Sequence, residues 1–201
     1  MKDRATLITL GITGAIVAVM LAVFFLGSGV QEPTISGLKT YSISDKERNH
    51  VTQTVAYKQT PAVGGNHHPT WANCEGRIYT SVLQTEKAVH SLEHGAVWVT
   101  YKPGTDKKLL DAFAKKVEKK PYIMMSPVAE QADNLMMSAW GNQLTVPSAD
   151  DKRVDEFISK FAQSTSAPEP GAACSTAGGG ASGGSGLNPG ETPEEHAKEQ
   201  Q

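Results

Sequence analysis

The sequence lacks a surplus of basic charge, and this absence excludes a common way of binding nucleic acid. Its 201 residues include 19 Lys and Arg and 21 Asp and Glu, which gives a formal net charge of −2. A protein that neutralises nucleic-acid phosphates needs a strongly basic face. We therefore expect no nucleic-acid partner. The sequence also shows no internal repeat, so we expect one domain and no solenoid.

Cysteine is scarce, because the chain contains only Cys74 and Cys174. In an exported domain such a pair is most simply a disulfide, and two isolated thiols that bind metal are the alternative. A disulfide between them would close a loop of about 100 residues, for which the chain-entropy model gives about 4.7 kcal/mol as an upper figure.

Ionisable side chains are absent from a long apolar run near the N-terminus, Ala5 to Gly27. A helix of about 20 apolar residues spans the hydrocarbon core of a membrane. Lys2 and Arg4 precede the run, so the N-terminus is expected in the cytoplasm and the rest outside it. We predict a single-pass protein of the cell membrane with a transmembrane anchor at residues 1–28. A cleaved signal peptide is the alternative, although its apolar core would be shorter, roughly 7 to 15 residues.

The remaining chain divides by composition into three parts. Residues 29–40 are predicted to be a linker and residues 41–175 an extracytoplasmic domain. Residues 176–201 form a Gly/Ser-rich tail that closes in charged residues. Such a composition buries too little apolar surface to offset chain entropy, so the tail is predicted to be disordered.

The hydrophobic periodicity of residues 41–175 predicts an α+β fold, with a mostly antiparallel sheet covered by helices. Thr85 is the expected cap of the first helix and Gly95 its expected end. Helices are predicted at about residues 86–94, 106–118 and 150–161. Strands are predicted in "AVWVTYKPG", "YIMMSPV", "NLMMSAW" and "QLTV", and a weaker one in "HVTQTVAY".

Methionine and tryptophan are better explained by packing than by binding. Met124-Met125 and Met136-Met137 suit Cu(I), but each pair lies in a predicted strand, where one member must face the core. The three tryptophans, Trp71, Trp98 and Trp140, are likewise predicted to be packing anchors.

The segment "AVHSLEHGAV" carries the strongest signal of chemistry. In a helix, residues three and four apart share a face, so His90, Glu93 and His94 would project together. In a strand, the two histidines would stand roughly 13 Å apart and could not share an ion. The upstream loop "GGNHHP" can present a third imidazole, and three imidazoles suit Zn, Cu, Ni or Fe. We therefore predict a transition-metal site, with Glu93 orienting a histidine or accepting a proton.

Two other hypotheses account for the same residues. The first is a non-catalytic structural or assembly module of the cell envelope, in which the side chains form a buried hydrogen-bond network and a partner is another envelope protein. The second is a metal-dependent hydrolase, because H-x-x-E-H is also the inverted zinc-peptidase signature with the glutamate as general base. The short helix and the small domain count against a hydrolase, so we expect binding rather than catalysis.

The region from His50 to Cys174 resembles the uncharacterised family named domain of unknown function 3105, whose members are membrane-anchored. The segments that carry this resemblance are "HVTQTVAY" (50–57), "PAVGGNHHPTWANC" (61–74), "AVHSLEHGAVWVTYKP" (88–103), "SAWG" (138–141) and "PEPGAAC" (168–174).

The resemblance implies family histidines at His50, His67, His90 and His94, whereas His68 is not part of the family pattern. We therefore predict that His67, His90 and His94 bind the metal, with His50 as a further candidate ligand. It also supports a disulfide between Cys74 and Cys174. The chain departs from the pattern at "CEGRIY", where family members run from cysteine straight into glycine and tyrosine. The family has no established activity. The most concrete role that we predict is the handling of copper or zinc at the cell envelope.

Overall fold

The computed structural model describes residues 34–175 and the backbone of residues 186–187. The predicted anchor (1–28), part of the predicted linker (29–33) and nearly all of the predicted tail (176–201) lie outside the described residues. Within the described ranges, no helix is long and apolar enough to cross a bilayer. The anchor therefore stays a prediction.

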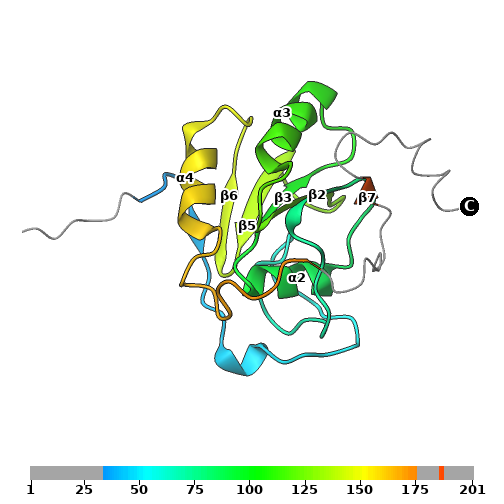
Figure 1. The fold of residues 1–201 in the computed structure, drawn as a ribbon, viewed down its shortest axis with the longest axis vertical. Helices are drawn as coiled ribbons and strands as arrows, with labels where there is room; N and C mark the ends of the chain where they lie inside the picture. The colour runs from blue at the N-terminus through cyan, green and yellow to red at the C-terminus, as the bar shows by residue number, and fades with distance from the viewer. Residues whose placement is uncertain (1–33, 176–185, 188–201) are drawn as a thin grey trace, which may run out of the picture. The chain divides into compact units, whose positions relative to one another are not determined.

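The described chain has a mixed α+β fold (Figure 1). Asp106 and Asp151 cap α3 and α4 through their carboxylates, which accept from main-chain nitrogens two residues on. In chain order the elements are β1 (Lys39–Thr40), the 3-10 helix η1 (Asp45–Glu47), β2 (Glu75–Tyr79), α2 (Thr85–Glu93), β3 (Val97–Tyr101), α3 (Lys107–Val117), β4 (Ile123–Pro127), β5 (Leu135–Ala139), β6 (Asn142–Thr145), α4 (Lys152–Phe161) and β7 (Gly186–Leu187).

The three predicted helices and four of the predicted strands are confirmed, with small shifts at their ends. The predicted cap of α2 is wrong, because Thr85 is already helical and Gln84 stands at the cap without a side-chain bond. The weak strand over residues 50–57 is also wrong, since this segment forms only an isolated bridge between His50 and His67. The main-chain nitrogen of Val55 instead donates to the Glu86 carboxylate on α2.

The sheet is mostly antiparallel, as predicted, but it is mixed because two of its strand pairs are parallel. Its strand order is β1-β6-β5-β3-β4-β2-β7. Four neighbouring pairs are antiparallel, but β4 runs parallel to both of its neighbours, β3 and β2. Strand β2 was not predicted, because its polar residues and Gly76 hide the alternation of a strand. It lies within the "CEGRIY" segment in which the chain departs from the family pattern.

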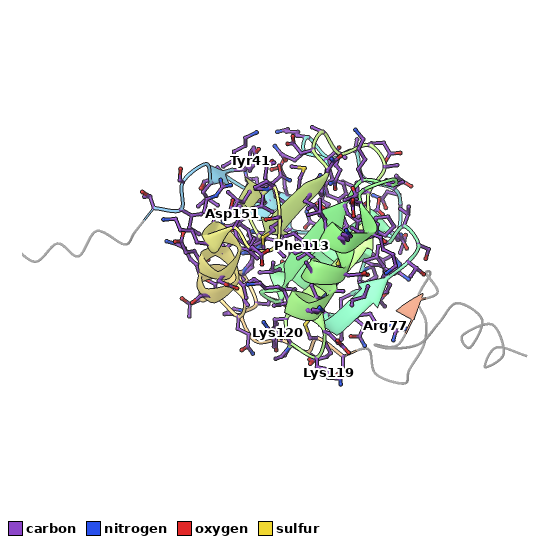
Figure 2. The ribbon with its side chains drawn as sticks, turned by 90° about the horizontal axis from the view of Figure 1, so that it is seen from above. Tyr41, Arg77, Phe113, Lys119, Lys120 and Asp151 are labelled. Atoms are coloured by element: carbon purple, nitrogen blue, oxygen red, sulfur yellow. A yellow bond between two sulfur atoms is a disulfide. The ribbon has the colours of Figure 1, made fainter. Side chains whose placement is uncertain are left out.

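The parallel strands place α2 and α3 on opposite faces of the sheet. The chain passes from β2 over the position of β4 to β3, and then returns through α3 to β4. Crossovers of this kind are nearly always right-handed, so a reversal of direction along the sheet moves the next helix to the other face. Figure 2 shows α3, marked by Phe113, beside α4, whose cap Asp151 is labelled. Lys116 and Asp155 join these two helices by an ion pair of 2.7 Å.

Two apolar clusters cover the two faces. On one face α3 and α4 bury Phe113, Val117 and Phe157 against the sheet, with Met125 and Met137 among the strand residues. On the other face, residues of α2 pack with residues of the sheet and of loops, including Ala88, Leu92, Trp98, Met124 and both cysteines. The four strand methionines are all buried, which confirms their prediction as core residues.

Replacing Gly76 with alanine should destabilise the domain more than replacing Gly104. Both glycines have positive φ, +66° and +90°, and a left-handed L residue costs about 1–2 kcal/mol. Only at Gly76 would the added Cβ also collide with main-chain nitrogen, that of Lys119, whereas nothing lies within 4 Å at Gly104. Urea titration of the full chain measures the loss of unfolding free energy in both variants, and equal losses would show that the close approach of Gly76 to Lys119 does not affect stability.

Candidate metal site

Helix α2 is buried on nearly all sides. Ala88 and Leu92 belong to the apolar cluster on one face of the sheet, and seven of the nine residues of the helix are buried. Ser91 ties the helix to the preceding loop, because its hydroxyl donates to the carbonyl of Ala72 at 2.7 Å. The helix therefore carries His90, Glu93 and His94 at 3% exposure each, away from bulk water.

The helical rotation divides these polar residues between two sides. Each residue turns the helix by about 100°, so position i+3 lies about 60° to one side of position i and position i+4 about 40° to the other. Glu93 and His94 therefore flank His90 on opposite sides. His94 stands at the C-cap with right-handed helical dihedrals, so this geometry extends to it.

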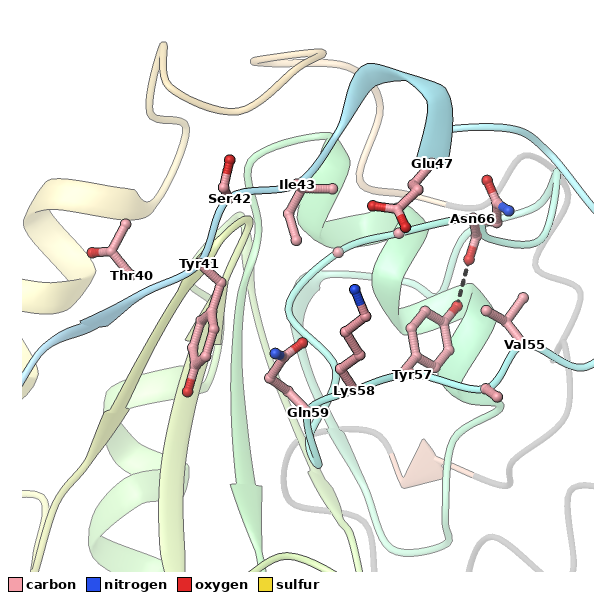
Figure 3. A pocket seen from close by; sticks show the side chains of 13 residues that line it. Thr40, Tyr41, Ser42, Ile43, Glu47, Val55, Tyr57, Lys58, Gln59 and Asn66 are labelled. Carbon is pink, nitrogen blue, oxygen red and sulfur yellow. Dashed lines mark hydrogen bonds between the residues drawn. The ribbon is translucent and has the colours of Figure 1, made fainter.

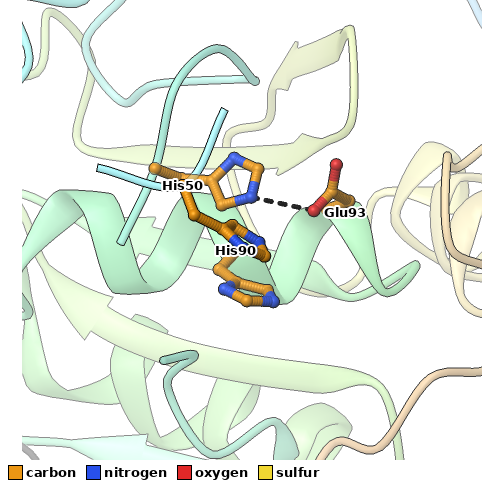
Figure 4. A group of neighbouring side chains, drawn as sticks. His50, His90 and Glu93 are labelled. Carbon is orange, nitrogen blue, oxygen red and sulfur yellow. Dashed lines mark ion pairs between the residues drawn. The ribbon is translucent and has the colours of Figure 1, made fainter. Parts of the chain in front are cut away.

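His67 reaches the Glu93 side of His90 from the loop before β2. Its main-chain nitrogen donates to Asn49 and its carbonyl accepts from Val51, at 3.1 and 2.7 Å. This bridge also brings the ring of His50 over the site. The His50 ring is stacked on that of His90, with centroids 4.8 Å apart and planes inclined by 21°. Figure 4 shows His50, His90 and Glu93 grouped beside α2.

His67 and Glu93 form a buried ion pair, with Nε2 2.8 Å from Oε2. Burial acts against the charge of both groups, but their mutual contact outweighs it, so the pKa of His67 is raised and the pKa of Glu93 is lowered. Among the described residues, His67 Nε2 finds no partner with hydrogen-bond geometry. The 2.8 Å contact is therefore an ion pair without good hydrogen-bond geometry, and Arg48 lies 4.0 Å from the other oxygen of Glu93.

His90 is held by the main chain of the same loop. Its Nδ1 lies 2.6 Å from the carbonyl oxygen of His68. A carbonyl oxygen only accepts, so Nδ1 must carry the proton and Nε2 the lone pair. Burial is the main reason that the pKa of His90 falls to about 4, and the neighbouring histidines act in the same direction. The ring is therefore neutral at pH 7 and able to bind a cation.

His94 is held by the segment that follows α4. Its Nδ1 lies 2.8 Å from the carbonyl oxygen of Ala173, and Nε2 lies 3.7 Å from the carboxylate of Glu169. The same segment caps the end of α2, since Glu169 N donates to Glu93 O and Gly171 N to His94 O. Burial again lowers the pKa of this histidine.

The disulfide holds that C-terminal segment in place. Cys74 and Cys174 are bonded, with Cα atoms 4.9 Å apart, as predicted for the pair. The main-chain nitrogen of Cys74 donates to the carbonyl of Cys174, and the hydroxyl of Tyr122 donates to Ala172. Both sulfurs are consumed by the disulfide, so neither cysteine offers a thiolate to a metal.

The candidate ligand atoms fall into two groups, each with all atoms within 4.8 Å of one another. The first contains His50, His67, His90 and Glu93, and the second contains His90, His94 and Glu169. All the histidines predicted from the sequence are present. They do not form one cluster, however, because His94 groups with Glu169 rather than with His67.

Glu169 and two tryptophans were not recognised in the sequence as site residues. Glu169 lies in "PEPGAAC", which looks like a loop and holds no histidine. The ring of Trp71 lies 5.5 Å from that of His90 and 4.9 Å from that of His94, and Trp140 lies 6.0 Å from His67. Both therefore form apolar walls at the site, which spacing along the chain does not indicate.

The two remaining histidines do not join either group. The Nδ1 of His68 lies beside the hydroxyl and main-chain nitrogen of Thr70, and only its carbonyl contacts His90. His196 lies outside the described residues. The sequence-based choice of His67 over His68 thus agrees with the geometry.

A pocket of about 440 Å³ borders the loop that carries His67. It is lined by residues 40–43, Glu47, residues 55–59 and residues 64–66 (Figure 3). Within it, the Tyr57 hydroxyl donates to the carbonyl of Asn66 at 2.7 Å. Gly65, whose carbonyl accepts from His67, also lines it. The pocket is thus next to the site, but its lining includes none of the described candidate ligands.

The chain belongs to the family described as "Protein of unknown function (DUF3105)", whose model matches residues 50–176. This match covers more than half of the 201 residues and includes every candidate ligand of both groups. The family resemblance of the sequence motifs is therefore confirmed. No curated protein and no solved structure matches the chain.

A double-mutant cycle on His67→Ala and Glu93→Ala should reveal strong coupling in metal-free protein. Buried partners in direct contact couple by about 0.5–3 kcal/mol, and we expect the upper half of this range because both groups are at most 4% exposed. The exposed pair Lys107–Asp111, at 2.7 Å, is the matched control, with an expected coupling of about 0.3–0.5 kcal/mol. Unfolding of the full chain in urea with a chelator measures both, and similar values for the two pairs would contradict the buried ion pair.

Proposed function

We propose that this member of the DUF3105 family binds one transition-metal ion through His50, His67, His90 and Glu93. The observation that carries the proposal is the fixed orientation of two buried imidazoles. His67 and His90 each donate Nδ1–H to a main-chain carbonyl, so each ring presents Nε2 to the site, and His67 would release its Nε2 proton when an ion replaces the contact with Glu93. Metal-binding histidines in proteins are oriented in the same manner, with the second ring nitrogen bonded to a carbonyl or carboxylate.

The donor set favours Zn²⁺ or Cu²⁺. Three imidazoles and one carboxylate supply four nitrogen and oxygen donors, which suit tetrahedral Zn²⁺ and also Cu²⁺. The orphaned Nε2 of buried His67 fits this role, since a buried nitrogen without a hydrogen-bond partner is costly unless another group satisfies it. Soft sulfur ligands are lacking in the described part of the chain, because the cysteines are bonded to each other and the methionines are buried in the core.

The proposed setting is the outer side of the cell membrane. The disulfide between Cys74 and Cys174 supports it, because such bonds persist in oxidising compartments outside the cytoplasm. The apolar run at residues 5–27 supports attachment by a single N-terminal span. In this setting the domain would handle copper or zinc at the envelope, where another envelope protein is the expected partner.

A structural module is the second candidate function, and the His67–Glu93 ion pair favours it. Each of the three imidazole Nδ1 groups already has a main-chain acceptor. The same residues could therefore hold the loop before β2 and the C-terminal segment against α2 without any ion.

A hydrolase is less favoured by this geometry. In an H-x-x-E-H peptidase the two histidines hold one ion and the glutamate acts on its water. Here Glu93 contacts His67 and groups with His50, on the opposite side of His90 from His94.

Metal content and affinity test the proposal on the full chain, purified in detergent without a histidine tag. After loading with Zn²⁺ or Cu²⁺ and removal of excess ion, we expect one ion per chain by elemental analysis. His67→Ala should weaken binding, measured by competition with a chelator, by at least the 10–100-fold that loss of a supporting residue typically costs. His68→Ala is the matched control, because its side chain lies outside both groups and its carbonyl is retained.

The two candidate functions predict different results. A wild-type chain that folds and retains its disulfide but holds no Zn²⁺ or Cu²⁺ would establish the structural module instead. Equal affinity of the His67→Ala and His68→Ala variants would overturn the proposed ligand set.

A further inference from the structure

We infer that the H-x-x-E-H helix offers a second position for the same ion, formed by His90, His94 and Glu169. This inference rests on the proposed function and extends it from one binding position to two. The second group meets the same distance condition as the first, with all its candidate atoms within 4.8 Å of one another. The positions lie on opposite sides of His90 because Glu93 and His94 diverge by about 100° around the helix.

His90 makes the two positions mutually exclusive. Its Nδ1 proton is bonded to the carbonyl of His68, so only Nε2 has a lone pair. One lone pair binds one ion. The protein therefore holds a single ion that is shared between two sets of partners, with His90 common to both.

The two positions are built by different parts of the chain. His50 and His67 come from the segments that bridge before β2. Glu169 comes from the C-terminal segment, whose Ala173 carbonyl also sets the proton of His94 on Nδ1. The disulfide at Cys174 anchors this segment. Either position can therefore be altered without removing a ligand of the other.

The second position is the weaker of the two, although each group has one exposed member, Glu169 here and His50 in the first. It has three candidate ligands instead of four. Its carboxylate, Glu169, is 53% exposed, whereas the Glu93 side chain is 4% exposed. Trp71, at the rim, is half-buried and covers the rings of His90 and His94. An ion would pass between the two positions by exchanging partners around a fixed His90.

The test uses Cu²⁺ with the tag-free full chain. The wild type should bind one Cu²⁺, and Glu169→Gln alone should leave its affinity within about twofold, because the ion rests in the first position. His67→Ala should still bind one Cu²⁺, more weakly and with a changed EPR spectrum. Adding Glu169→Gln to His67→Ala should then lower the residual affinity by about tenfold or more. Glu130→Gln, which alters an exposed carboxylate outside both groups, is the control in each background.

The outcomes separate this inference from the proposed function. A wild type that binds no Cu²⁺ or Zn²⁺ overturns both. If the wild type binds Cu²⁺ but His67→Ala does not, only the second position is overturned. The same holds if His67→Ala binds Cu²⁺ and its affinity changes no more with Glu169→Gln than with Glu130→Gln. Should His67→Ala fail to fold by circular dichroism, Glu93→Gln replaces it, because it removes a ligand of the first position while keeping the side-chain volume.

Discussion

Buried imidazole N–H groups need hydrogen-bond acceptors, and the candidate site is arranged around that requirement. His67, His90 and His94 are all removed from water, and each donates Nδ1–H to a different main-chain carbonyl. Polar groups without partners are rare in protein interiors because each costs free energy. These hydrogen bonds also determine which nitrogen of each ring, Nε2, has no main-chain partner. The contacts that make burial tolerable therefore leave Nε2 as the nitrogen through which each ring can bind a metal ion once that nitrogen is unprotonated.

The short spacing of H-x-x-E-H has a different consequence here than in a single-ion peptidase site. Glu93 and His94 lie on opposite sides of His90, so two loops can each complete a group with part of the same helix. The loop before β2 contributes from one side and the C-terminal segment from the other. The geometry of both groups thus depends on how the covering segments are held as much as on the helix itself. Both segments are hydrogen-bonded to the helix. The loop before β2 is bonded through Ser91, and the C-terminal segment is bonded through the main chain of residues 169–171.

The sheet sets the position of α2 and so of the whole site. The reversal of chain direction between the β2–β3 and β3–β4 crossovers places α2 alone among the described α-helices on its face, with α3 and α4 opposite. A single short helix leaves part of that face to be covered by loops. Polar side chains of those loops are then buried beside the helix, whereas on the other face two amphipathic helices form an ordinary apolar core. The disulfide joins the two ends of this loop cover, near β2 and at the C-terminal segment.

The sequence by itself determined the elements with strong periodicity, the pairing of the two cysteines and the choice of His67, His90 and His94. Helical spacing is local information, and the family motifs marked the histidines. Only the tertiary structure decided that β4 lies parallel between β3 and β2, that β2 exists despite its polar residues, and that the histidines divide into two groups. It also brought in Glu169, which lies 75 residues after His94 in the chain. These features depend on the hand of the crossovers and on contacts between segments that are far apart in the chain and joined by the disulfide. Hydrophobic periodicity within a short stretch of sequence contains no information on either.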